Sequence, residues 1–275
     1  MVVSIALRSV SVTVVFLSKL RITKKRRLIS GAFFVCVLFV SNLQAKTCIP
    51  ADVDRFRSVG LVEVVDGDTL RLATGESVRL SGVNTPEMNY GKKHGREPFS
   101  VEATDFVSRV LAERPVYIEV QGRDKYQRLI ADVWFQGSAN WNMLSFEILR
   151  EGFGFQIFEF DSVYAECLHS AEQKARAKKL GVWSQLDYWL NQERGGFVLW
   201  RGTIKKLSRG KRYSWARIAN DRVVRISSEW VRSGSVSKKI SGEVVEVRGW
   251  AIHRKNTRYE PYMLPIKSPQ QFQFN

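Results

Sequence analysis

Four short segments between residues 66 and 128 combine carboxylates and guanidinium groups in a pattern that suits chemistry on a phosphate ester. They are Asp66-Gly67-Asp68-Thr69, Arg79, Asn84-Thr85-Pro86-Glu87 and Asp124-Lys125-Tyr126-Gln127-Arg128. Carboxylate and carbonyl oxygens are the ligands that hard cations prefer, and a carboxylate beside a bound water can act as a general base. Guanidinium groups bind the anionic oxygens of a phosphodiester in bidentate fashion.

Each segment also has a purely structural explanation. Asp-Gly is common in hairpin turns, and Thr-Pro-Glu is a common way to enter a loop. A loop rich in Lys and Arg is often only solvated surface. No single segment therefore identifies a function, and the information lies in the order and spacing of the set.

That order and spacing resemble the staphylococcal nuclease (thermonuclease) family, from about Leu61 to Trp183. The resemblance includes Ala171-Glu172 and Ala175-Arg176 in the last predicted helix and the closing Gly181-Val182-Trp183. It implies an oligonucleotide-binding barrel that hydrolyses phosphodiester bonds of DNA, RNA or both. The expected fold class is α+β: a small five-stranded OB-type barrel with three helices, followed by a second, mostly β, small barrel-like domain.

The resemblance also assigns a role to each polar residue of the expected site. The catalytic residues would be Arg79, Glu87 and Arg128, the metal ligands Asp68, Asn84 and Thr85 with Asp66 close behind, and the substrate-phosphate contacts Lys125 and Tyr126. In this scheme the two arginines clamp the phosphate and Glu87 is the general base.

One position departs from the family pattern. The resemblance implies Ca²⁺ as the divalent cofactor, and the family usually has a second Ca²⁺-binding Asp directly before Thr-Pro-Glu, where this chain has Asn84. Because Ca²⁺ affinity follows the charge of the ligands, we expect weaker binding or an altered metal preference. Two hypotheses follow: a metal-dependent nuclease, favoured by Asp68, Arg79, Glu87 and Arg128, or a catalytically weakened nucleic-acid-binding or scaffold protein on the same fold, favoured by Asn84.

The N-terminus has the features of a secretory signal peptide. Residues 1–45 contain seven basic residues and no acidic one, and a basic cluster precedes the apolar run 28–40 and a cleavage site near Ala45. Thirteen apolar residues are few for an uncleaved anchor, and no run reaches the ~18 residues of a membrane span. We therefore expect no stable membrane span after cleavage and a periplasmic or secreted protein. In such a compartment Cys48 and Cys167 could form a disulfide or remain as two buried thiols.

The remaining chain divides into two predicted domains, 46–190 and 191–275, with a linker over 184–195. In the first, strands are expected over 61–65, 70–72, 78–80, 116–120 and 129–135, and helices near 100–111, 142–150 and 163–179. In the second, only strands are expected, over 197–207, 213–219, 223–226, 242–252 and 259–266.

The net charge of +16 is divided unevenly between these parts. Residues 46–195 hold 19 Lys+Arg and 22 Asp+Glu, whereas residues 196–275 hold 17 and 5. The attraction to a polyanion thus belongs to the second domain. Its aromatic residues Trp200, Tyr213, Trp215, Trp230 and Trp250 could line a groove for single-stranded nucleic acid or form an ordinary core.

Overall fold

The computed structural model describes residues 5–7, 10–12, 48–89, 95–138, 140–158, 162–218, 222–236, 241–255 and 260–274. Residues 1–43 form one unit and residues 44–275 another. The described part of the first unit is an antiparallel pair, β1 (Ile5–Leu7) and β2 (Val10–Val12), and the rest of the predicted signal peptide lies outside the described residues. Among the described residues, no helix has the length and apolarity to cross a bilayer.

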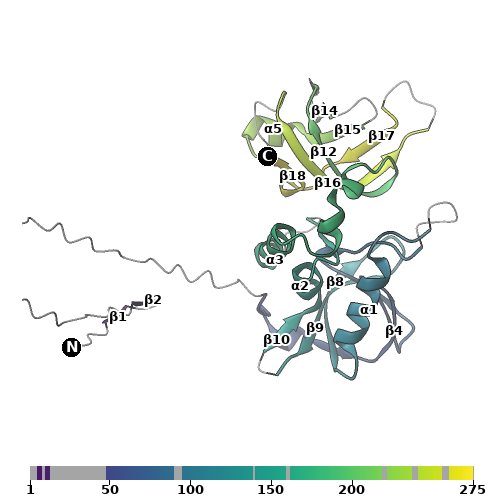
Figure 1. Cartoon of the computed structure of the whole chain (residues 1–275), viewed down its shortest axis with the longest axis vertical. Helices are drawn as coiled ribbons and strands as arrows, with labels where there is room; N and C mark the ends of the chain where they lie inside the picture. Colours follow the sequence, from purple (N-terminus) through teal and green to yellow (C-terminus); the bar gives the residue numbers. More distant parts are fainter. Residues whose placement is uncertain are drawn as a thin grey trace, which may run out of the picture. The chain divides into compact units, whose positions relative to one another are not determined.

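A curled sheet forms the first domain of the second unit, here residues 48–190 (Figure 1). Its strands are β3 (Arg57–Val59), β4 (Leu61–Asp66), β5 (Thr69–Leu72), β6 (Ser77–Leu80), β8 (Val116–Arg123), β9 (Leu129–Gln136) and β10 (Trp141–Met143). They are hydrogen-bonded in the order β3-β8-β9-β6-β5-β4, with β10 paired to β9. Only the β6–β9 pairing among them is parallel in the described residues. A separate pair joins β7 (Val83–Asn84) to β11 (Phe155–Gln156).

Three helices cover this sheet, as the sequence predicts. They are α1 (Ser100–Leu111), α2 (Leu144–Arg150) and α3 (Ala165–Ala177). Helix α1 buries Ala103, Val107 and Leu111, which recur every four residues and so lie on one face. The core between sheet and helices includes the fully buried Leu80 and Ile118.

Two expectations for this domain need correction. The expected barrel has five strands, β4, β5, β6, β8 and β9, but the sheet contains two more, because the three-residue β3 and β10 add to it. The segment 184–195, predicted as a linker, contains the end of the 3₁₀ helix η2 (Gly181–Gln185) and all of α4 (Leu186–Leu190). Trp189 in α4 is 3% exposed, so this segment is packed rather than free.

The second domain is mostly β, as predicted. Its strands are β12 (Gly196–Thr203), β13 (Lys206–Arg209), β14 (Tyr213–Arg217), β15 (Arg222–Ser227), β16 (Val244–His253), β17 (Tyr262–Pro265) and β18 (Phe272–Phe274). The order is β12-β16-β17-β15-β14-β13, with β18 on β16. The single strand expected over 197–207 is in fact two strands, β12 and β13.

The prediction that this domain contains only strands is wrong. Helix α5 (Ser228–Ser233) follows β15 directly, and its C-cap is Gly234, whose φ is +85°. Six residues are fewer than two helical turns, too few for a periodic apolar pattern to develop.

The two domains share a buried boundary within their common unit. Phe155, Trp183 and Trp189 of the first domain belong to one apolar cluster with Phe197 and Leu199 of the second. The Phe155 and Phe197 ring centroids are 5.5 Å apart. The second domain therefore packs against the first through aromatic side chains.

Cys48 and Cys167 form a disulfide, with their Cα atoms 5.4 Å apart. The bond joins the start of the described first domain to α3, across 119 residues of chain. Of the two alternatives that the sequence leaves open, the structure has the disulfide.

Candidate active site

A cleft of about 700 Å³ collects the polar residues that the sequence analysis singles out. They come from the β4–β5 turn, from β6, from β7 with the segment after it, and from the loop between β8 and β9. The predicted residues that line it are Asp66, Asp68, Arg79, Asn84, Glu87, Lys125, Tyr126 and Arg128. Thr85, which is not among the lining residues, donates hydrogen bonds to Asp68 from behind.

The β4–β5 turn can approach the rest of the site only because it contains Gly67. A Cβ atom at this position would lie 2.8 Å from Thr85 Oγ1 and 2.9 Å from the Ala103 Cβ of α1. Contacts that short do not occur in folded proteins, so another residue would push the turn outward. Glycine therefore keeps Asp66 and Asp68 at the floor of the cleft.

Asp68 connects three of the predicted segments. Its Oδ2 accepts hydrogen bonds from the Thr85 backbone N–H at 2.7 Å and from Thr85 Oγ1 at 3.1 Å. Its Oδ1 lies 2.9 Å from Arg79 Nη1 and also accepts from Thr69 Oγ1. Asp68 is 5% exposed, and such a buried carboxylate must be paired.

Arg79 is held in place by the segment that follows it. Nη1 donates to the Val83 carbonyl at 2.9 Å, and Nη2 donates to Asn84 Oδ1 at 2.8 Å. Together with Asp68, these partners fix the guanidinium at the edge of the cleft, where its side chain is 12% exposed.

Glu87 has an exposed side chain at the cleft and lies in an electronegative environment. Partial desolvation by the surrounding protein, followed by the nearby Asp68, Asp66 and Glu97 carboxylates, raises the pKa of Glu87 to about 7 against the opposing effect of Arg79. Burial and the adjacent Asp68 likewise raise the pKa of Asp66 to about 6. The negative charge of these carboxylates therefore exceeds the positive charge of Arg79 at this end of the cleft.

Glu97 is a site residue that the sequence analysis missed. Its Oε2 accepts a hydrogen bond from the Glu87 backbone N–H at 2.6 Å, and the Glu97 N–H donates to the Glu87 carbonyl at 3.0 Å. Glu97 also forms an ion pair with Arg194. These contacts fix the backbone of Glu87. No local sequence motif predicts them, because ten residues separate the two glutamates.

The β8–β9 loop is organised by Asp124. Its Oδ1 accepts from the backbone N–H groups of Tyr126 and Arg128, and its Oδ2 accepts from Arg128 Nε at 2.7 Å. The Tyr126 ring is 68% exposed, and Lys125 Nζ lies 4.8 Å from its centroid. Asp124 thus supports the loop and aims the guanidinium of Arg128, while Lys125 and Tyr126 face solvent at the cleft.

Comparison with known proteins relates the first domain to a known family. Residues 77–185 match the family model described as staphylococcal nuclease homologue. The thermonuclease of Staphylococcus hyicus is 28% identical over 166 residues, which cover 54% of this chain and 93% of that protein. Residues 77–185 belong to the staphylococcal nuclease family.

Other relatives of the first domain come from bacteria and fungi. A protein of Haemophilus influenzae named uncharacterized endonuclease is 25% identical over 169 residues, 58% of this chain and 86% of that protein. The probable endonuclease lcl3 of Botryotinia fuckeliana is 32% identical over 116 residues, 39% of this chain. The chain spans only 42% of the length of that fungal relative.

The cleft of the first domain contains oxygen atoms that could act as ligands of a divalent cation. Asn84 Nδ2 donates to the Thr85 carbonyl, and Thr85 donates to Asp68, so these three predicted ligands form one hydrogen-bonded group. In the described part of the chain, no three His, Cys, Asp or Glu side chains are arranged to hold a metal. A cation would therefore depend on Asp66 and Asp68 together with neutral oxygens. Such a donor set, with its excess negative charge, fits a hard cation.

Residues of the second domain also line the cleft of the first domain. Trp250 of β16 and Lys267 line it, together with Ile157, which follows β11. In the sequence, Trp250 is one of five aromatic residues that could line a groove or form a core, and no motif singles out Lys267. Nothing in the local sequence indicates this placement, because it depends on how β16 packs beside β11.

Proposed function

We propose that the protein is an exported nuclease that hydrolyses phosphodiester bonds of DNA, RNA or both with the aid of a divalent cation. The proposed cation is Ca²⁺, bound more weakly or with an altered metal preference because of Asn84. The observation that carries the proposal is that Arg79, Glu87 and Arg128 line the same cleft although they come from three separate segments. The names of the relatives, thermonuclease and endonuclease, support the reaction class.

The chemistry follows from the charge of the substrate. A phosphodiester resists nucleophilic attack because its oxygens are anionic, and its transition state gathers more negative charge. Arg79 and Arg128 offset that charge with fixed N–H donors. The contact with Asp124 uses Nε of Arg128, and the guanidinium has four further N–H donors for phosphate oxygens.

Glu87 is the proposed general base. It accepts a proton as a water oxygen forms a bond to phosphorus, and the bond between phosphorus and the leaving sugar oxygen breaks. The leaving oxygen then takes a proton from solvent. A bound cation, held by Asp68, Asn84, Thr85 and Asp66, would neutralise phosphate charge and polarise the attacking water.

Export is part of the proposal and is supported by two independent features. One is the basic and then apolar composition of residues 1–45. The other is the disulfide between Cys48 and Cys167, because disulfides persist in oxidising compartments such as the periplasm and the extracellular space.

A second candidate function is binding of nucleic acid without efficient cleavage. The observation that favours it is the contact between Arg79 Nη2 and Asn84 Oδ1 at 2.8 Å. That amide oxygen is one of the few metal ligands available here, and in this arrangement it is hydrogen-bonded to the guanidinium. A weakly held cation would leave a site that binds phosphate but turns over slowly.

Digestion of single-stranded DNA separates the two candidates. Wild type is incubated with Ca²⁺, Mg²⁺, Mn²⁺ or EDTA and compared with Glu87→Ala. The matched control is Glu102→Ala, which removes an exposed carboxylate from α1, outside the cleft. A nuclease cleaves with at least one cation, loses cleavage with Glu87→Ala and keeps it with Glu102→Ala. Absence of cation-dependent cleavage by wild type would rule out the nuclease and leave the binding function as the remaining candidate.

A further inference from the structure

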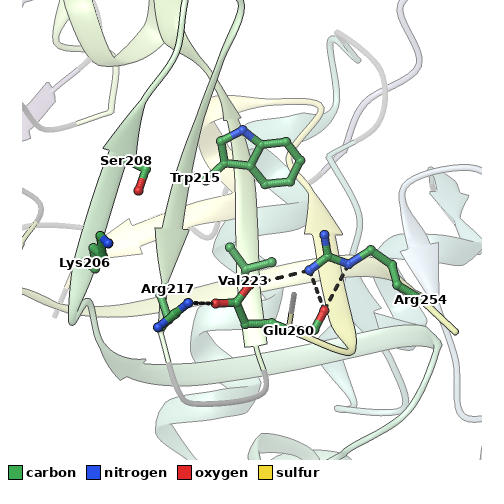
Figure 2. Close-up of a pocket in the computed structure, with 7 residues that line it drawn as sticks. All are labelled: Lys206, Ser208, Trp215, Arg217, Val223, Arg254 and Glu260. Carbon is green, nitrogen blue, oxygen red and sulfur yellow. Dashed lines mark hydrogen bonds and ion pairs between the residues drawn. The ribbon is translucent and has the colours of Figure 1, made fainter. Parts of the chain in front are cut away.

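A second cavity lies entirely within the second domain (Figure 2). It has a volume of about 520 Å³, within the range of small-ligand sites. Its lining residues are Lys206, Ser208, Trp215, Arg217, Val223, Arg254 and Glu260. None of them belongs to the cleft described above, so this cavity is separate from the candidate active site.

Strand alternation explains why these side chains share one face. In β14, Ser214 and Ala216 are buried, whereas Tyr213, Trp215 and Arg217 point to the opposite side of the strand. Across the ladder, Ser208 of β13 pairs with Trp215 and Lys206 pairs with Arg217. Figure 2 shows the Trp215 indole and these neighbours on adjacent strands.

Trp215 is not required for the core of the domain. The core is built around Trp200, which is 0% exposed, with Trp230 packed against it from α5. Trp215 remains partly exposed on the outer face of its strand. A large aromatic side chain at the wall of a cavity favours a ligand with a flat apolar surface.

The charged residues of the cavity are arranged around one carboxylate. Glu260 accepts from Arg217 at one end and is paired with Arg254 at the other, and its side chain is 9% exposed. These contacts orient two guanidinium groups before any ligand binds, which lowers the entropic cost of binding. With Lys206, the lining carries three cations and one anion. The ligand should therefore be anionic as well as aromatic.

Tyr213 extends the same face along β14. Residues two apart on a strand are about 6.6 Å from each other. The Arg225 guanidinium carbon lies 4.7 Å from the Tyr213 ring centroid, and that of Arg212 lies 5.3 Å from it. Two aromatic rings flanked by cations thus follow each other along one strand.

We propose that this face of β13, β14 and β15 is a binding site for single-stranded nucleic acid, with one base stacked on Trp215 and the next near Tyr213. Lys206, Arg217 and Arg254 contact the phosphates. Aromatic platforms combined with cations bind single strands with little sequence preference, because every base has a π-face. A duplex does not fit this description, since its bases are already stacked. The inference rests on the proposed function only for the choice of nucleic acid as ligand.

The test is equilibrium binding of the full chain in EDTA, which prevents metal-dependent cleavage. The probes are dye-labelled oligothymidylate and oligouridylate, followed by fluorescence anisotropy, with duplex DNA and polyglutamate as competitors. Trp215→Ala should raise the Kd by roughly five- to hundredfold, the loss expected for one stacked base. Trp215→Phe should stay near wild type because it keeps an aromatic ring. Lys206→Ala should reduce the slope of the logarithm of the binding constant against the logarithm of the salt concentration by about one, the value for one lost phosphate contact.

Tyr188→Ala is the matched control, since Tyr188 is a 39% exposed aromatic residue of α4 outside the cavity. Thermal melting of each variant verifies that it is folded. Binding by Trp215→Ala equal to wild type overturns the proposal, and so does more effective competition by duplex DNA or polyglutamate than by unlabelled single strands. Tighter binding of either oligonucleotide identifies DNA or RNA as the preferred ligand and supports the site.

Cleavage assays on the same variants keep the two proposals apart. If wild type cleaves nothing with any cation but Trp215→Ala loses binding, the nuclease function fails and this site holds. If wild type cleaves and Trp215→Ala binds normally, only this site fails.

Discussion

Arg248 of β16 and Glu172 of α3 form an ion pair that joins the two domains, with Nη1 2.6 Å from Oε1. Both side chains are almost fully buried, at 3% and 0% exposure. Glu172 Oε1 also accepts from the Gln156 backbone N–H, and Arg248 Nη1 donates to the Gln156 carbonyl. Gln156 belongs to β11, which pairs with β7 and hence with Asn84. A side chain of the second domain therefore helps to fix the strand beside the candidate active site.

Removal of Arg248 should destabilise the whole unit. Arg248→Ala leaves Glu172 as a buried, unpaired charge, which typically costs about 3–5 kcal/mol. Urea unfolding monitored by circular dichroism gives the free energy of unfolding. Arg71→Ala is the control, because Arg71 forms an exposed pair with Glu63 and its removal should cost less than about 1 kcal/mol. Equal effects of the two substitutions would refute the structural role of the buried pair.

The stability of the unit should fall in acid because of Glu246. Burial raises the pKa of Glu246, but the hydrogen bonds and charges of Arg176, Arg248 and Arg201 outweigh it and hold the pKa below its ordinary range. A carboxylate with a lowered pKa in the folded state stabilises the fold above its unfolded pKa, near 4.3. That contribution disappears as the pH falls through the lower, folded value.

The measurement is the melting temperature of wild type and Glu246→Gln between pH 3 and pH 7. The variant should be less stable than wild type at pH 7, and the difference should shrink below about pH 4. A difference that stays constant over this range would argue against the assigned pKa direction.

Loss of the disulfide should lower stability without changing the cleft. In a chain-entropy model, a bond that closes a loop of 119 residues stabilises the fold by about 2–5 kcal/mol. The double variant Cys48→Ala/Cys167→Ala should therefore melt at a lower temperature. Reductant should lower the melting temperature of wild type toward that of the variant and leave the variant itself unchanged. A reductant effect on the variant would show that another process is responsible.

Asn84 should determine the metal response. Asn84→Asp adds a carboxylate next to Asp68, and affinity for Ca²⁺ rises with the charge of the ligands. If the protein cleaves DNA, we expect the Ca²⁺ concentration for half-maximal activity to fall roughly tenfold or more. Asn84→Ser, which adds no charge, is the control. An unchanged Ca²⁺ response in Asn84→Asp would rule out a role of this position in metal binding.

Trp250 should contribute to substrate binding more than to the chemical step. Trp250 lines the cleft but belongs to the second domain, whereas the predicted catalytic residues belong to the first. Stacking of a base on an aromatic ring is worth about 1–3 kcal/mol. Trp250→Ala should raise KM for single-stranded DNA and leave kcat within about twofold. Since Trp250 also packs edge-on against Phe197, Trp250→Phe serves as the packing control. A fall in kcat with unchanged KM would place Trp250 in a different role.

Local signals in the sequence were sufficient for the three helices that cover the sheet of the first domain. Helices α1, α2 and α3 begin and end within two residues of the ranges that the sequence predicts. The predicted polar segments also line a common cleft. Turns and helices depend on residues near in sequence, so their positions can be read from short windows.

Contacts between distant segments could be decided only by the tertiary structure. Arg248 and Glu172 are 76 residues apart, and Cys48 and Cys167 are 119 apart, so no window of sequence contains either pair. The contact between Glu97 and Glu87 is also a property of the fold, because the chain between them must turn back before Glu97 can accept a hydrogen bond from the Glu87 N–H.

The aromatic residues of the second domain show the division most clearly. The sequence determined that this part of the chain is basic, rich in aromatic residues and built mainly of strands. Only the folded sheet decided that Trp200 is buried, that Trp215 lies at an outer cavity and that Trp250 reaches the cleft of the first domain. Successive residues of a strand face opposite sides, and which side is the core depends on what packs against the sheet, a property that no single strand contains.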